Sequence, residues 1–258
     1  MNYHDSVVAF ADLAVAKREN LRHNPAGFFV LAMMAGAYVG LGILLIFSVG
    51  QGVDAAFRPI VMGASFGIAL ILVVFAGSEL YTGHTMYLTH GFLMKKTSFG
   101  DLLACWLTSW TGNLVGAVLL AFLFVYGGGG LILGSGESSF LHQVAYKKMQ
   151  GAPLQLFFNG ILCNWLVCLA LWCAARTQND FAKIGVIWFC LYAFIAAGFE
   201  HSVANMTIFA VALFSEHPDS ITLTGALRNL IFVSAGNAVA GVGAMGIGYW
   251  LAAGRPKG

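Results

Sequence analysis

Six long apolar stretches dominate this sequence and constrain its fold more than any other feature. They cover residues 27–49, 59–88, 102–126, 154–175, 184–212 and 226–252. A helix needs about 20 apolar residues to cross the hydrocarbon core of a bilayer, so each stretch is long enough to span it. Only 9% of the residues are charged, against about 25% in a soluble domain. The sequence therefore predicts an all-α membrane protein with six transmembrane helices in the lipid bilayer.

The distribution of basic residues predicts the orientation of the chain. If both termini are cytoplasmic, nine of the 13 lysines and arginines fall on the cytoplasmic side and four on the opposite side. Because lysine and arginine are enriched in cytoplasmic loops, this orientation is the expected one. The net charge of +2 is small and no basic run is present, so nucleic acid is not an expected partner.

Residues 1–26 are predicted to form a separate N-terminal element on the cytoplasmic side. They lack the basic start, apolar centre and cleavage site of a signal peptide. Apolar residues recur at roughly helical spacing, namely Val7, Val8, Phe10, Ala11, Ala14 and Val15. The pattern favours a helix on the membrane surface, with anchoring and gating both open as roles. Residues 27–252 then form the transmembrane domain, and residues 253–258 a cytoplasmic tail.

The cysteines predict neither a disulfide framework nor a metal site. All five lie inside apolar runs, without the spacing of metal ligands: Cys105, Cys163, Cys168, Cys173 and Cys190. Such cysteines act as small buried packing residues. Neither a metal ion nor another cofactor is expected.

Two of the apolar stretches carry clustered polar residues and glycines in their interiors. The second stretch is interrupted by GSELYTGH at residues 77–84, and the fifth by GFEHSVAN at residues 198–205. Non-helical backbone at membrane depth is tolerated only where protein buries it or where it lines a cavity. Spans two and five are therefore predicted to be broken helices.

The two interruptions resemble each other and predict an internal repeat. The segment beginning AGSE at Ala76 recurs as AGFE 121 residues later, and GNLVG at Gly112 recurs as GNAVA 124 residues later. Each repeat unit contains three spans, which is an odd number. The second copy therefore crosses the membrane in the opposite orientation to the first. We expect an inverted repeat, as in aquaporins, with halves at about 27–126 and 154–252 and a substrate site where the breaks meet.

The ionisable residues set most clearly within the apolar spans are Glu79, Glu200 and His201. A charge at the bilayer centre costs at least about 2.5–3.5 kcal/mol, so such residues face the protein interior. The glutamates are interpreted mainly as supports that accept hydrogen bonds from freed backbone N–H groups. Two interpretations of His201 are kept: it is a packing residue, or it binds an anion and exchanges a proton with it. Asn205 would share its helix face, and the hydroxyl of Thr82 would face it across the repeat axis.

The segments AGSELYTGHT, TGNLVGA, GILCNWLVCLALW and AAGFEHSVANMT, in this order, carry a family resemblance over nearly the whole chain. The sequence resembles the formate/nitrite transporter family, and within it the nitrite channels. The resemblance implies six-helix protomers that assemble into homopentamers in the bacterial inner membrane. It also implies that each protomer has its own pore.

The resemblance assigns roles to residues of this chain. His201 is similar to the central pore histidine of the family and Thr82 to the loop threonine that faces it. The other implied pore residues are Glu200, Asn205, Asn164 and, at the periplasmic entrance, Lys148. The implied constriction residues are Phe66, Leu70, Leu80, Tyr81, Val167 and Phe194. Apolar side chains at such positions resist ion passage by excluding water.

The expected function is passage of a small monovalent anion, most of all nitrite, with His201 able to exchange a proton with it. The sequence does not distinguish proton symport from channel-like conduction of the anion. A formate or hydrosulfide channel of the same family is the alternative within this class, and a channel for water or neutral solutes is the alternative outside it. An enzyme is not expected, because Glu200 and His201 do not form the H-E-x-x-H pattern of a metalloprotease.

Overall fold

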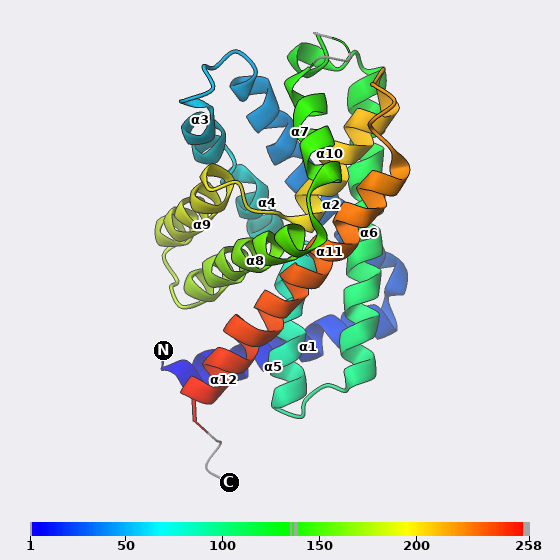
Figure 1. Cartoon of the computed structure of the whole chain (residues 1–258). Coiled ribbons are helices and arrows are strands. Elements are labelled where there is room, and N and C mark those ends of the chain that lie inside the picture. The colour runs from blue at the N-terminus through cyan, green and yellow to red at the C-terminus, as the bar shows by residue number, and fades with distance from the viewer. Residues whose placement is uncertain (1, 135, 137–138, 255–258) are drawn as a thin grey trace.

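The computed structural model describes residues 2–134, 136 and 139–254, and regular structure in this part of the chain is helical throughout. Figure 1 shows the start of α1 and the end of α12 at the same end of the molecule, with α1 running across that end. The predicted tail at residues 253–258 lies largely outside the described residues, which end at Gly254.

The helices follow one another in two series. The first contains α1 (Tyr3–His23), α2 (Pro25–Gly50), α3 (Arg58–Ser65), α4 (Ile68–Ala76), α5 (Tyr81–Leu93) and α6 (Phe99–Tyr126). The second contains the short 3-10 helix η1 (Gly130–Ile132), α7 (Phe140–Gln150), α8 (Pro153–Ala175), α9 (Asp180–Ala196), α10 (Ser202–Phe214), α11 (Leu223–Val239), the π-helical segment η3 (Ala240–Ile247) and α12 (Gly248–Ala252).

Within the described residues, five helical segments are long and apolar enough to cross a membrane. They are Pro25–Gly50, Arg58–Ala76, Phe99–Tyr126, Pro153–Ala175 and Leu223–Ala252. The predicted fifth span, 184–212, is divided between α9 of 17 residues and α10 of 13 residues, and each is shorter than one membrane crossing.

The structure adds elements that the sequence analysis did not predict. The connection 127–153, between the third and fourth apolar stretches, contains η1 and α7. Helix α7 begins where the Ser139 side chain accepts a hydrogen bond from the His142 amide. The second apolar stretch has an additional interruption at Phe66 and Gly67, between α3 and α4.

The apolar face of α1 packs on the rest of the protein. Phe10 lies between the rings of Tyr87 on α5 and Trp172 on α8, with both centroid distances 5.3 Å. The face predicted to lie on the membrane surface is thus used, in large part, for contacts within the chain.

Two long helix pairs approach each other closely at glycines. A Cβ atom at Gly116 of α6 would lie 1.8 Å from the Met33 carbonyl of α2, and one at Gly236 of α11 would lie 2.1 Å from the Phe157 carbonyl of α8. Small residues at such crossings let helix backbones touch, which is the usual basis of helix association in lipid.

Both predicted interruptions are present, and they have nearly the same backbone geometry. Gly77 ends α4 with φ of 75°, and Gly198 follows α9 with φ of 74°, both in the left-handed region that favours glycine. The chain then runs extended to Leu80 (φ −94°, ψ 122°) and to His201 (φ −109°, ψ 115°), which cap the N-termini of α5 and α10.

An asparagine on α6 closes the first break. The Asn113 amide donates to the carbonyls of Glu79 at 2.9 Å and Ala32 at 2.7 Å, and its oxygen accepts from the Tyr81 N–H at 2.9 Å. Asn113 is fully buried. One side chain thereby satisfies backbone groups on both sides of Leu80, at the end of the extended segment and the start of α5, and joins them to α2.

An asparagine on α11 closes the second break in the same way. The Asn237 amide donates to the carbonyls of Glu200 at 3.1 Å and Gly160 at 2.8 Å, and its oxygen accepts from the Ser202 N–H at 3.0 Å. We call Asn113 and Asn237 the two break asparagines. An unpaired backbone group in an apolar interior is costly, so these contacts hold the interruptions in place.

Replacing Asn237 with alanine is expected to lower the free energy of unfolding by about 1–3 kcal/mol, because it strands buried backbone groups of Ser202, Gly160 and Glu200. The midpoint of thermal unfolding in detergent measures this loss. Thr111→Ala is the control, since Thr111 is exposed and its hydroxyl donates to the Leu107 carbonyl of its own helix. Equal midpoints for the two variants would contradict the role of Asn237.

Candidate functional site

Three cavities lie in a row between the two series of helices. A cavity of about 280 Å³ is lined by residues that include Lys17, Lys183, His84, Leu70 and Leu80; we call it the Lys17 cavity. A larger cavity of about 630 Å³ is lined by residues that include Lys147, Lys148, Glu200, Asn205 and His201; we call it the Lys148 cavity.

A third, much smaller cavity of about 10 Å³ lies between them and is called the neck. Its lining residues are Val39, Phe66, Ala69, Leu70, Leu80, Val167, Leu191, Phe194 and His201. Leu70 and Leu80 are shared with the Lys17 cavity, while Phe194 and His201 are shared with the Lys148 cavity. The shared residues place the three cavities along one path that narrows in the middle. A volume near 10 Å³ is about the least that holds a single water.

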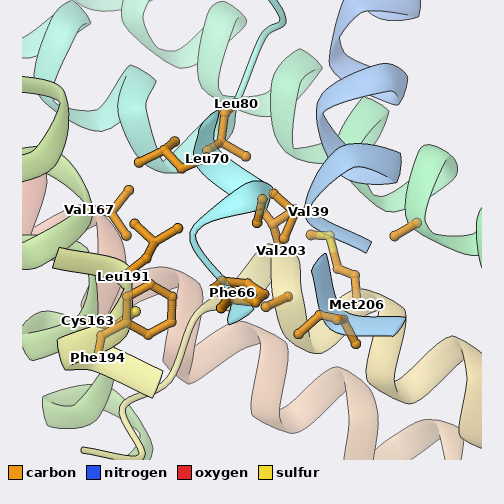
Figure 2. Packing of buried hydrophobic residues seen from close by; sticks show 14 of the residues in the cluster. Val39, Phe66, Leu70, Leu80, Cys163, Val167, Leu191, Phe194, Val203 and Met206 are labelled. Atoms are coloured by element: carbon orange, nitrogen blue, oxygen red, sulfur yellow. The ribbon is translucent and has the colours of Figure 1, made fainter. Parts of the chain in front are cut away.

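The walls of the neck are almost entirely apolar. Figure 2 shows Leu70 and Leu80 together at one end of this group, and Phe66 and Phe194 at the other end. The rings of Phe66 and Phe194 meet edge to face, with centroids 5.5 Å apart. All four of these side chains are buried. Among the residues that line the neck, His201 is the one with a polar side chain.

His201 is held in a fixed orientation at the junction of the neck and the Lys148 cavity. Its Nδ1 accepts a hydrogen bond from the Ala204 N–H at 3.1 Å. The proton of the neutral ring is therefore on Nε2, which lies 3.3 Å from the Thr82 hydroxyl and donates toward it. The ring stacks on Phe194 with centroids 5.8 Å apart. This geometry presents one N–H donor at the end of an apolar passage.

The carboxylate of Glu200 is paired on both of its oxygens. Lys148 on α7 donates to one oxygen at 2.9 Å, and the Asn205 amide donates to the other at 2.6 Å. Asn205 also donates to the Asn229 side chain at 2.9 Å. The predicted residues Lys148, Glu200 and Asn205 thus form one connected group on the wall of the Lys148 cavity.

Glu79, at the other break, is paired in a parallel way. Lys17 of α1 lies 2.8 Å from its carboxylate, and His84 Nε2 lies 2.7 Å from it. Glu79 was expected at the break from the sequence, but its partners Lys17 and His84 were not. Nothing in the sequence indicates that α1 brings Lys17 to this position, because the contact joins residues 62 positions apart.

Asn164 supports the segment that carries Thr82. Its amide donates to the Thr82 carbonyl at 3.3 Å, to the Thr85 hydroxyl at 3.0 Å and to the Asn237 carbonyl at 2.6 Å. Asn164 is fully buried. The structure therefore places it behind Thr82, where it positions the threonine and one of the break asparagines.

Most of the residues predicted to form the constriction are brought together. Phe66, Leu70, Leu80, Val167 and Phe194 all line the neck, joined by Val39 and Leu191, which the sequence analysis did not single out. Tyr81 is placed differently, because its hydroxyl donates to the Ser234 carbonyl on α11 at 3.2 Å. That contact directs Tyr81 to α11, outside the group that lines the neck.

Comparison with known sequences gives close relatives over most of the chain. The chain is 54% identical over 230 residues to "Nitrite transporter NirC" of Salmonella typhimurium (strain LT2), covering 89% of this chain and 84% of that protein. It is 53% identical to the protein of the same name in Escherichia coli (strain K12), with coverage of 89% and 85%. It is 39% identical over 240 residues to "Probable formate transporter" of Methanothermobacter thermautotrophicus, covering 86% of each.

Solved structures agree with this relationship. A structure described as "FNT family ion channel" matches with a TM-score of 0.93 and 51% identity, over 96% of this chain and 98% of that one. A structure described as "Pentameric formate channel with formate bound" matches with a TM-score of 0.67 and 26% identity, over 88% and 96%. The profile of the formate/nitrite transporter family matches residues 7–251. The chain therefore belongs to the formate/nitrite transporter family.

Proposed function

We propose that this protein is a transmembrane channel for small monovalent anions and that nitrite is its main substrate. The observation that carries the proposal is His201, a fixed N–H donor at the end of an otherwise apolar neck between two wider cavities. The relatives that are 53–54% identical are named nitrite transporters, which supports the choice of anion.

The proposed membrane topology follows from the two broken helices. α3–α5 together and α9–α10 together each form one crossing, which gives six crossings in an inverted three-helix repeat. The matching backbone geometry at Gly77 and Gly198 and the two break asparagines support this arrangement.

Both termini face the cytoplasm, and the protein lies in the bacterial inner membrane. It forms a homopentamer like the related formate channel, with one path in each protomer.

We propose the following path for the anion. Lys148 and Lys147 raise the local concentration of anions in the Lys148 cavity. Beyond it, the neck has room for about one water and few polar groups, so a bare anion would lose most of its hydration there. The N-termini of α5 and α10 adjoin the neck through their N-cap residues Leu80 and His201, and the positive end of a helix dipole favours negative charge nearby.

His201 lowers the cost of this passage by hydrogen bonding to the anion or by giving it a proton. The neutral ring, with Nδ1 accepting from the Ala204 N–H, gives the anion a hydrogen bond only. Proton transfer needs the imidazolium form, in which Nδ1 has left the Ala204 N–H and taken a proton from the cavity; the Nε2 proton then passes to nitrite, which gives nitrous acid and the neutral ring. If the proton travels with the anion, the process is symport; if it returns to His201, the process is conduction of an anion. Thr82 holds the Nε2–H in line, and Asn205 and Glu200 form the polar wall beside it.

Formate is the second candidate substrate. The specific observation is that related proteins are named "Probable formate transporter", at 39% identity, and "Formate channel BtFdhC", at 34% identity. Formate and nitrite are both small, planar monoanions of weak acids. A competition assay in which each anion is offered against labelled nitrite ranks them, along with hydrosulfide and an uncharged solute.

The variant His201→Phe is expected to reduce nitrite flux into liposomes about 10-fold to 100-fold, as expected for the loss of a hydrogen bond to a charged group worth about 1.5–3 kcal/mol. Phenylalanine retains the stacking on Phe194 but removes the acceptor of the Ala204 N–H, so thermal unfolding in detergent checks that the variant is folded. His23→Phe is the control, because that side chain is 78% exposed on α1. Unchanged flux in a folded His201→Phe protein would exclude the role of His201, and internal pH recorded in parallel separates symport from conduction.

The variant Lys148→Gln is expected to raise the nitrite concentration for half-maximal flux by about threefold to tenfold, because it removes a positive charge and leaves Glu200 unbalanced. Lys147→Gln removes the same charge from the same cavity without touching that pair, so its effect should be smaller. Concentration series at low and high salt measure both effects, which should shrink as salt increases. Equal effects of the two variants would show that the pair with Glu200 is irrelevant.

A further inference from the structure

The two helix breaks differ in one position that bears on charge. In the second break, Glu200 is contacted by Asn205, five residues later. In the first break, Glu79 is contacted by His84, also five residues later. Each glutamate also has a lysine partner, Lys148 or Lys17. The two groups therefore share one plan, with an amide at one site and an imidazole at the other.

This difference makes the charge of one group variable. Lysine, glutamate and asparagine together have a net charge of zero across the physiological pH range. Lysine, glutamate and a neutral histidine are also at zero, but protonation of the histidine raises the total to +1. Only the group at the Lys17 cavity can change in this way.

The contacts of His84 leave one ring nitrogen available for the added proton. Nε2 lies 2.7 Å from the Glu79 carboxylate, so Nε2 carries the proton of the neutral ring. Nδ1 has no hydrogen-bond partner within the described part of the chain, and the side chain is 1% exposed. Nδ1 is therefore the ring position at which a second proton binds, opposite the nitrogen that faces the Glu79 carboxylate.

The other groups around His84 define its electrostatic surroundings. The charged groups are Glu79 from the break and Lys17 from α1, with Lys183 of α9 on the same cavity wall. The ring of Phe28 on α2 lies 5.8 Å away, and that of Tyr87 on its own helix 6.3 Å away. Trp106 of α6 donates to the His84 carbonyl at 3.1 Å, which holds the backbone of α5 in place.

We propose that Lys17, Glu79 and His84 form an anion-binding site on the wall of the Lys17 cavity whose affinity rises when the solution on that side becomes acidic. Its ligand is a small monovalent anion of the size of nitrite. The inference rests on the proposed function, since it takes the Lys17 cavity to be one mouth of the path. The Lys148 cavity lacks this response at the equivalent group, because Asn205 does not titrate.

The variant His84→Asn tests the proposal, because it copies the arrangement around Glu200 into the first break. The protein is reconstituted in one orientation, verified by the access of protease to a C-terminal tag. Nitrite is added on the side of the chain termini at pH 7.5 or 5.5, with the pH of the other side held constant; nitrite stays ionised in this range. The nitrite concentration for half-maximal flux should fall by about threefold or more in the wild type. It should not change in His84→Asn.

His90→Gln is the matched control. His90 lies two turns further along α5, is fully buried and has no hydrogen-bond partner among the described residues. The pH response should survive in this variant. If His84→Asn does not fold, as judged by thermal unfolding in detergent, His84→Gln replaces it with the same expected result.

Three results would overturn the proposal. The wild type lacks the pH response, a variant at His84 keeps the response, or His90→Gln loses it, which would assign the response to His90. A wild type that conducts no nitrite at either pH would instead reject the proposed function, so the two failures are distinct. Changing the pH on the Lys148 side should affect the wild type and His84→Asn equally.

Discussion

The structure depends on how two helices can stop in the middle of a bundle that lipid surrounds. A broken helix leaves N–H and C=O groups without partners, and no water is present in the hydrocarbon core to accept them. Asn113 and Asn237 solve this problem with one side chain each, because an amide both donates and accepts. These contacts allow Leu80 and His201 to cap the half-helices at either end of the neck.

The chemistry of the path follows from this arrangement. Because the breaks meet near the centre, the two wide cavities are separated only by a short apolar neck. Leu80 and His201 occupy equivalent backbone positions, but one is apolar and the other is a hydrogen-bond donor. The same asymmetry recurs one turn further on, where His84 and Asn205 contact equivalent glutamates. Similar backbone geometry thus supports two ends with different electrostatic properties.

Sequence reasoning predicted the parts of the fold that depend on local composition. The apolar stretches indicated the long helices, and the polar clusters beginning at Gly77 and Gly198 indicated the breaks. The matching GNLVG and GNAVA segments contain Asn113 and Asn237, but nothing in the sequence indicated that these side chains close the breaks. Helix α7 was missed because it lies in a polar connection without a strong apolar period.

The candidate site was predictable where its residues lie within the repeated motifs. Thr82, Glu200, His201 and Asn205 are of this kind, and the structure brings them together. Lys17 was not predictable as a partner of Glu79, because their contact depends on how α1 folds back across the end of the bundle (Figure 1). Tyr81 was assigned from its neighbourhood in the sequence, whereas its direction is set by a distant partner, the Ser234 carbonyl.

The central claim is that the anion passes through the neck of a single protomer and meets His201 there. A high-resolution structure of the reconstituted protein with bound nitrite tests it most directly. The account predicts density for the anion within hydrogen-bond distance of His201 Nε2, beside the Thr82 hydroxyl. Nitrite density along a route between protomers, with none in the neck or in either cavity beside it, would contradict the account.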